Sequence, residues 1–155
     1  MSAILAPLRE AVAEFLGTFI LVFFGVGAVH VAVLTGALPG LWQVASVWGV
    51  GIALAIYATG SISGTHLNPA ITVAFAAFRK FPLRKVGPYV FSQCAGAFVA
   101  AALLYALYSG SIARYEAANG LARGGPGRPA AQRSPPKTFH FAPFFRLTLQ
   151  PQPVH

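Results

Sequence analysis

Few side chains in this sequence could carry out catalysis or bind a metal. The 155-residue chain has no Asp, three Glu (Glu10, Glu14 and Glu116), four His and one Cys. General acid and base catalysis usually requires paired carboxylates, and Ca²⁺ and Mg²⁺ sites require several carboxylate oxygens. Both kinds of site are close to excluded, so we expect no catalytic residue, no metal and no cofactor.

The tripeptide Asn68-Pro69-Ala70 has the chemistry of a helix start. Asn is a preferred N-cap, and Pro is favoured at the first helical position. The apolar segment that follows ends near Phe78, so a helix over 68–78 rises about 16 Å, roughly half the hydrocarbon thickness of a bilayer. On its own the tripeptide predicts only a helix start. Its position between two membrane-length segments favours a half-helix that begins near the middle of the membrane.

Two other ionisable residues lie in apolar surroundings. His66 could act as a proton relay or metal ligand, but no second His, Cys or carboxylate accompanies it, so we favour a role for its backbone carbonyl and local packing. Glu14 lies near the start of an apolar segment, and an ionisable group inside a membrane span indicates a functional role. The alternative for Glu14 is an acid that reaches back to the membrane interface.

Long apolar segments must position these residues. Hydrophobic residues make up 56% of the chain and charged residues only 9%, against about 25% charged in an ordinary soluble domain. Three segments predict transmembrane helices, at about 12–34, 41–60 and 86–108. A cleaved signal peptide is the alternative for the first, but its apolar part is too long and no basic leader precedes it. We predict an all-α transmembrane fold with three spanning helices and one re-entrant half-helix, 68–78.

The backbone before the half-helix has a predicted role of its own. Irregular backbone is tolerated at membrane depth only when protein buries it or when it lines a water-filled cavity. Carbonyls of Gly64, Thr65 and His66 could then accept hydrogen bonds from a passing hydroxyl group. The half-helix start adds a partial positive charge of about half a unit, and the Asn68 amide adds a donor. This combination favours passage of a neutral hydroxylated solute and repels cations.

The basic residues predict the orientation of the chain. Five of them flank one side of the predicted spans and two flank the other: Arg9, Arg79, Lys80, Arg84 and Lys85 against Arg114 and Arg123. By the positive-inside rule, residues 1–11 are predicted to be cytoplasmic. The quartet between 79 and 85 has a second interpretation, a site for lipid headgroups. A net charge of +8 could also suggest nucleic acid, but these residues form no patterned nucleic-acid surface, so that partner is not expected.

Two stretches resemble the signature segments of the aquaporin, or major intrinsic protein, superfamily. They are Ala13-Glu14-Phe15-Leu16-Gly17-Thr18 and Ser63-Gly64-Thr65-His66-Leu67-Asn68-Pro69-Ala70. The resemblance covers residues 10–124. Ser46-Val47-Trp48-Gly49 and Ser92-Gln93-Cys94-Ala95-Gly96-Ala97 are more similar to bacterial glycerol uptake facilitators than to water-selective members.

The resemblance implies a function and roles for residues. Residues 12–123 would form the first of two repeats in a bacterial inner-membrane channel for glycerol, other small neutral solutes and water. Trp48 would supply an apolar wall of the selectivity filter, with a lipid-facing Trp as the alternative. Asn68, Pro69 and Ala70 would form the family motif, and Glu14 and Gln93 would support the re-entrant loop. A tetramer, or association with full-length channel subunits, is implied as well.

The sequence departs from the family pattern after about Gly124. Family members have two inverted repeats, whereas this chain contains one Asn-Pro-Ala motif and lacks the second motif, its following Arg and three further spans. Residues 124–155 hold seven of the twelve prolines, and we expect this tail to be disordered or out of frame. The predicted function is therefore a half-channel. The alternatives are a non-conducting truncated fragment and half of a water-selective aquaporin.

Overall fold

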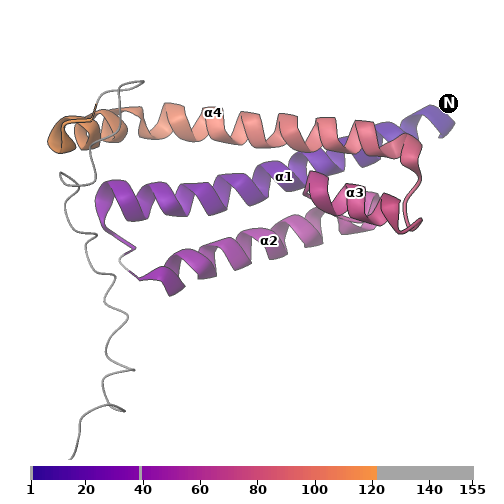
Figure 1. Ribbon diagram of the computed structural model, residues 1–155, viewed down its shortest axis with the longest axis horizontal. Helices are drawn as coiled ribbons and strands as arrows, with labels where there is room; N and C mark the ends of the chain where they lie inside the picture. Colours follow the sequence, from indigo (N-terminus) through magenta and orange to yellow (C-terminus); the bar gives the residue numbers. More distant parts are fainter. Residues whose placement is uncertain (1, 39, 122–155) are drawn as a thin grey trace, which may run out of the picture.

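The computed structural model of the protein describes residues 2–38 and 40–121, and every regular element in these residues is a helix (Figure 1). The elements in chain order are α1 (Ser2–Thr35), α2 (Leu41–Ser63), α3 (Pro69–Ala77), the short 3-10 helix η1 (Leu83–Lys85) and α4 (Val86–Asn119). The predicted all-α fold is confirmed. The predictions for the tail, residues 124–155, fall outside the described part of the chain.

Three of these helices are long and apolar enough to cross a membrane, which confirms the predicted number of spans. The candidate spans are Leu5–Thr35, Leu41–Ser63 and Leu83–Asn119. At 1.5 Å per residue, even the 23 residues of α2 reach about 34 Å, more than the hydrocarbon thickness.

Two helices extend well past the apolar segments that predicted them. α1 begins at Ser2 rather than near Val12, and α4 continues to Asn119 rather than ending near Tyr108. Polar residues at the membrane surface do not interrupt helical hydrogen bonding, so hydropathy marks the span and not the whole helix. α4 ends where Gly120 adopts a left-handed conformation, with φ of 59°, as glycine commonly does after a helix.

Small residues let the long helices pack closely, and α1 lies between α2 and α4 (Figure 1). A Cβ atom added to Gly96 of α4 would overlap the carbonyl oxygen of Phe15 in α1. On the other side of α1, a Cβ added to Gly51 of α2 would lie 2.9 Å from Cβ of Phe24. In lipid the hydrophobic effect does not drive helices together, so they associate through close van der Waals packing. Small residues allow this because they let two backbones approach each other.

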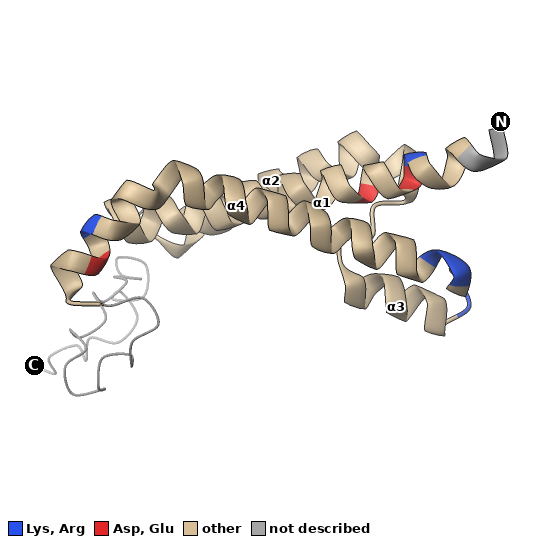
Figure 2. Cartoon of the chain, turned by 90° about the horizontal axis from the view of Figure 1, so that it is seen from above, with Lys and Arg blue, Asp and Glu red and all other residues tan. Residues whose placement is uncertain are grey.

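The short helix α3 lies beside the first part of α4 (Figure 1). It has nine residues, from Pro69 to Ala77, and so rises about 13 Å. Its start is connected to the end of α2 by residues 64–68. The basic residues between α3 and α4 lie at the same end of the bundle as the start of α1 (Figure 2).

Candidate functional site

The loop between α2 and α3 has an unusual backbone. α2 ends at Ser63 because Gly64 turns left-handed, with φ of 82°, and its N–H donates to the carbonyl of Gly60 at 3.1 Å. Thr65 and Leu67 are also left-handed, with φ of 53° and 52°. Such a conformation costs a residue with a Cβ atom about 1–3 kcal/mol. Other interactions must therefore hold this loop in place.

The carboxylate of Glu14 provides those interactions. Its side chain has no exposed surface, and it accepts four hydrogen bonds. The donors are Ser63 Oγ at 2.6 Å and the His66 N–H at 2.9 Å to Oε1, and the Leu67 N–H at 2.8 Å and Gln93 Nε2 at 2.7 Å to Oε2. Successive backbone N–H groups that converge on one anion are a known consequence of left-handed turns. A carboxylate this deeply buried does not match the alternative of an acid at the membrane interface.

Gln93 and Thr72 extend the contact to α3. Gln93 Nε2 also donates to Thr72 Oγ1 at 3.0 Å, and the Thr72 hydroxyl lies 3.1 Å from the carbonyl oxygen of Asn68. A hydroxyl has one hydrogen, so when Thr72 donates to Asn68 it accepts from both Gln93 and Nδ1 of His66, which is 3.1 Å away. This network assigns the Nδ1–H tautomer to His66.

The His66 side chain is packed among aromatic rings rather than placed for metal binding. Its ring centre lies 5.0 Å from that of Phe75, 4.7 Å from Phe81 and 5.2 Å from Tyr89. Within residues 2–38 and 40–121, no group of three or more His, Cys, Asp or Glu side chains could hold a metal ion.

A second polar contact, which the sequence analysis did not identify, reaches the same loop from the end of the bundle. Tyr89 Oη lies 2.9 Å from the carbonyl oxygen of Ser63 and 3.2 Å from Oε2 of Glu10. Lys85 Nζ pairs with both oxygens of Glu10, at 2.8 and 2.7 Å. Because Lys85 already satisfies the carboxylate, the single Tyr89 hydrogen is available for Ser63.

Residue spacing contained the signal for these contacts. Glu10 and Glu14 are four residues apart on α1. Lys85, the last residue of η1, is four residues before Tyr89 of α4, and Tyr89 is four before Gln93. Residues four apart share one face of a helix, so each helix carries a polar ridge, and the two ridges meet.

Three backbone carbonyls of the loop are left without a partner. The Ser63 carbonyl accepts from Tyr89, and the Leu67 carbonyl lies 3.4 Å from the Thr18 hydroxyl. The carbonyls of Gly64, Thr65 and His66, between them, accept no hydrogen bond from the described residues. The N–H groups of the loop are used on the Glu14 side, which leaves these carbonyl oxygens free to bind something else.

Asn68 completes the site at the start of α3. Its Oδ1 accepts from the N–H of Ala70 at 2.8 Å, and Pro69 has no N–H to satisfy. Asn68 is exposed, and its Nδ2 donates to no described residue. An amide donor therefore lies two residues after the last of the three carbonyls, with Leu67 between them.

Trp48, the remaining predicted site residue, is outside the loop and its hydrogen-bond network. It lies on α2, fifteen residues before Ser63 and so about 22 Å along the helix. The side chain is half-buried, and its indole ring packs where a Cβ on Gly25 of α1 would be. Trp42, by contrast, is 69% exposed.

Comparison with known proteins identifies the family to which this arrangement belongs. The sequence profile described as "Major intrinsic protein" matches residues 2–128. The chain belongs to the major intrinsic protein family. It is therefore a membrane protein with three apolar spanning helices in its described part.

Individual members of the major intrinsic protein family show the same similarity. The glycerol uptake facilitator protein of Haemophilus influenzae is 51% identical over 115 residues, which are 74% of this chain and 44% of that protein. The propanediol uptake facilitator PduF of Citrobacter freundii is 50% identical over 74% of this chain and 43% of its own length. The X-ray structure of the aquaglyceroporin from Plasmodium falciparum superposes with a TM-score of 0.64 at 38% identity, covering 70% of this chain and 45% of that one. The chain spans less than half the length of these relatives.

Proposed function

We propose that the chain forms part of a membrane channel for the passive transport of glycerol and other small neutral solutes. The observation that carries this proposal is the run of three unpartnered carbonyls, of Gly64, Thr65 and His66, followed by the free amide of Asn68, within the described residues. A solute with several hydroxyl groups can donate to the carbonyls and accept from the amide. It would then exchange its hydrogen bonds with water for equivalent ones with protein.

The electrostatics of α3 favour a neutral solute over a cation. The N-terminus of a helix carries a partial positive charge of about half a unit, and here it adjoins the Asn68 Nδ2 donor. Both repel a cation at the point where the carbonyls would otherwise attract one. In this proposal Glu14 and Gln93 are supporting residues, because they hold the loop without contacting the solute.

Two finer assignments belong to the same proposal. Trp48 would give the path an apolar wall farther along, where an indole face can contact the hydrocarbon part of a polyol. The N-terminus and the basic loop lie at one end of the bundle (Figure 2). That end would be on the cytoplasmic side of a bacterial inner membrane.

The exposed side of α3 indicates that another protein surface completes the path. Ile71, Val73 and Phe75 are 46%, 52% and 40% exposed. A helix that spans only half a membrane, with irregular backbone at its start, is tolerated there only when protein surrounds it or when it lines a cavity. A second repeat or another channel subunit, as in a tetramer, would supply that surface. The same exposure favours the alternative that this chain inserts but does not conduct by itself.

Vesicle swelling distinguishes these two possibilities. The purified chain is incorporated into liposomes, and light scattering follows swelling in an inward glycerol gradient, with empty vesicles as the blank and the Haemophilus influenzae relative as the reference. Swelling faster than in empty vesicles with glycerol, but not with a sugar too large to pass, supports conduction by the chain. Incorporation without added flux supports the non-conducting alternative.

A further inference from the structure

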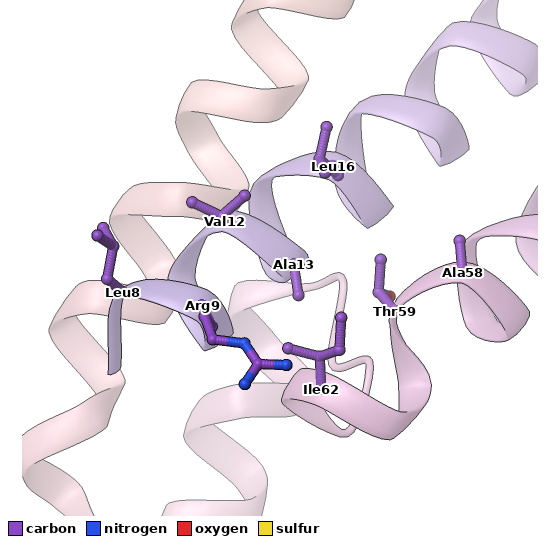
Figure 3. Close-up of a pocket in the computed structure, with 8 residues that line it drawn as sticks. All are labelled: Leu8, Arg9, Val12, Ala13, Leu16, Ala58, Thr59 and Ile62. Atoms are coloured by element: carbon purple, nitrogen blue, oxygen red, sulfur yellow. The ribbon is translucent and has the colours of Figure 1, made fainter. Parts of the chain in front are cut away.

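Two hollows adjoin each other between the start of α1 and the end of α2, and no residue of the loop 64–68 lines either of them. The larger has a volume of about 300 Å³ and the smaller about 160 Å³. Arg9 and Ile62 line both, so we treat the two as one groove. Figure 3 shows the residues that line the larger part. The groove opens to the outside of the helix pair and encloses none of the residues of the proposed solute path.

The two parts of the groove differ in chemistry. Apolar side chains dominate the larger part, which is lined by Leu8, Val12, Leu16, Ala58 and Ile62 among others. The smaller part contains the polar residues Arg9, Glu10 and Ser61. An elongated ligand that fills both must therefore be an amphiphile, with its apolar part along α1 and its polar part beside Arg9.

Arg9 supplies an uncompensated positive charge at the polar end. The neighbouring carboxylate of Glu10 is already paired with Lys85 at 2.7 Å. Arg9 makes no ion pair or side-chain hydrogen bond with any residue in 2–38 or 40–121. In Figure 3 its side chain reaches from α1 toward Ile62 of α2. The planar fork of a guanidinium matches the oxygens of a phosphate.

The groove also lies at the depth where such a ligand would be found. The candidate spans begin at Leu5 in α1 and end at Ser63 in α2, so Arg9 and Ser61 are close to the span ends. Leu16 and Ala58 lie farther into the spans. The polar-to-apolar order along the groove is therefore the order of headgroup and acyl chain in the membrane leaflet at that end.

We propose that this groove binds an anionic phospholipid. The phosphate contacts Arg9, the Ser61 hydroxyl is within the same polar hollow, and one acyl chain lies against Leu8, Val12 and Leu16. Arg9, Glu10 and Lys85 together carry a net charge of +1, which a headgroup with a net negative charge complements and a zwitterionic headgroup does not.

Native mass spectrometry of the purified chain in detergent tests the proposal by titration with phosphatidylglycerol and with phosphatidylcholine of the same acyl chains. The wild type should bind phosphatidylglycerol more tightly. Arg9→Gln should weaken that binding by about tenfold, the order of one charge-assisted contact. Arg114→Gln, near the C-terminal end of α4 and outside both hollows, is the matched control and should leave it unchanged. Circular dichroism checks that each variant keeps its helix content.

A second variant tests the apolar half of the groove. Ala58 is exposed in the groove, so Ala58→Trp should fill it and lower the affinity without removing charge. Equal binding of the two lipids would overturn the proposal, as would Arg9→Gln binding phosphatidylglycerol as the wild type does. A dimer that excludes lipid would also overturn it, since a second copy of the chain would then occupy the groove. None of these outcomes depends on solute transport.

Discussion

Replacing Glu14 by Gln tests whether the buried carboxylate holds the loop. Oε1 of Glu14 accepts from Ser63 and His66, and Oε2 accepts from Leu67 and Gln93. In the Glu14→Gln variant one of these oxygens becomes an NH₂ group, which is a donor. The Ser63 hydroxyl and the Gln93 amide can each turn to accept from this NH₂ group, but a backbone N–H cannot. Whichever way the introduced amide is turned, one buried backbone N–H, of His66 or of Leu67, therefore faces a donor and loses its acceptor.

The size of the effect follows from this count. One buried donor left unsatisfied costs about 1–3 kcal/mol. The left-handed conformations of Thr65 and Leu67 cost about 1–3 kcal/mol each, and the bonds to Glu14 offset this strain. Because the lost bond acts on a strained segment, the loop should open locally while the three long helices stay packed. A loss of about 2 kcal/mol accelerates exchange through local opening roughly thirtyfold.

Amide hydrogen exchange of the chain in lipid nanodiscs measures this directly. The His66 and Leu67 amides should exchange about thirtyfold faster in Glu14→Gln than in the wild type. Glu10→Gln is the matched control, because Glu10 contacts no backbone amide of the loop and its pair with Lys85 is partly exposed. Such a pair is worth up to about 1 kcal/mol, so the control should change exchange less than about fivefold. Unchanged exchange at His66 and Leu67 in Glu14→Gln would refute the assignment of Glu14 as the residue that holds the loop.

Three further substitutions have defined outcomes. Gly96→Ala should lower thermal stability in detergent by about 1–3 kcal/mol, because its Cβ would overlap a carbonyl oxygen of α1, whereas Gly49→Ala, with no atom within 4 Å, should not. Tyr89→Phe keeps the ring but removes the hydrogen bond to the Ser63 carbonyl. The free energy of local opening, measured by exchange of the loop amides, should therefore fall by about 0.5–1.5 kcal/mol. Asn68→Ala removes the capping oxygen and should destabilise the first turn of α3 by about 1 kcal/mol, measured by hydrogen exchange of its first amides. Asn68→Asp keeps the capping oxygen and should leave their exchange unchanged.

Features of the fold that depend on neighbours in sequence were predictable. A stretch of about twenty apolar residues indicates a span by its length alone, and three such stretches became α1, α2 and α4. The start of α3 was equally local. Asn68 caps the helix through Ala70, two residues away, and Pro69 occupies the first turn, as the preferences of these residues predict.

The contacts that hold the loop join distant parts of the chain, and local patterns do not specify them. Glu14 meets Ser63 across 49 positions and Gln93 across 79. Spacing by four places Glu10 with Glu14, and Lys85 with Tyr89, on single helix faces, but it does not state which faces meet. That depends on how closely α1 and α4 approach, which the structure resolves at Gly96. The family resemblance singled out Glu14 and Gln93, whereas the pair of Glu10 and Lys85 was found only from the coordinates.

The way the loop is held also determines what it can discriminate. Glu14 and Ser63 take the N–H groups of Thr65, His66 and Leu67, and the backbone carbonyls of Gly64, Thr65 and His66 have no partner among the described residues. A carbonyl has the same chemistry in every residue, so in the proposed path the loop accepts any small donor and distinguishes glycerol from water poorly. Discrimination must then come from side chains that limit width and polarity elsewhere. In the proposed path Trp48, which packs on Gly25 about 22 Å along α2 from Ser63, would do this together with the surface that covers α3.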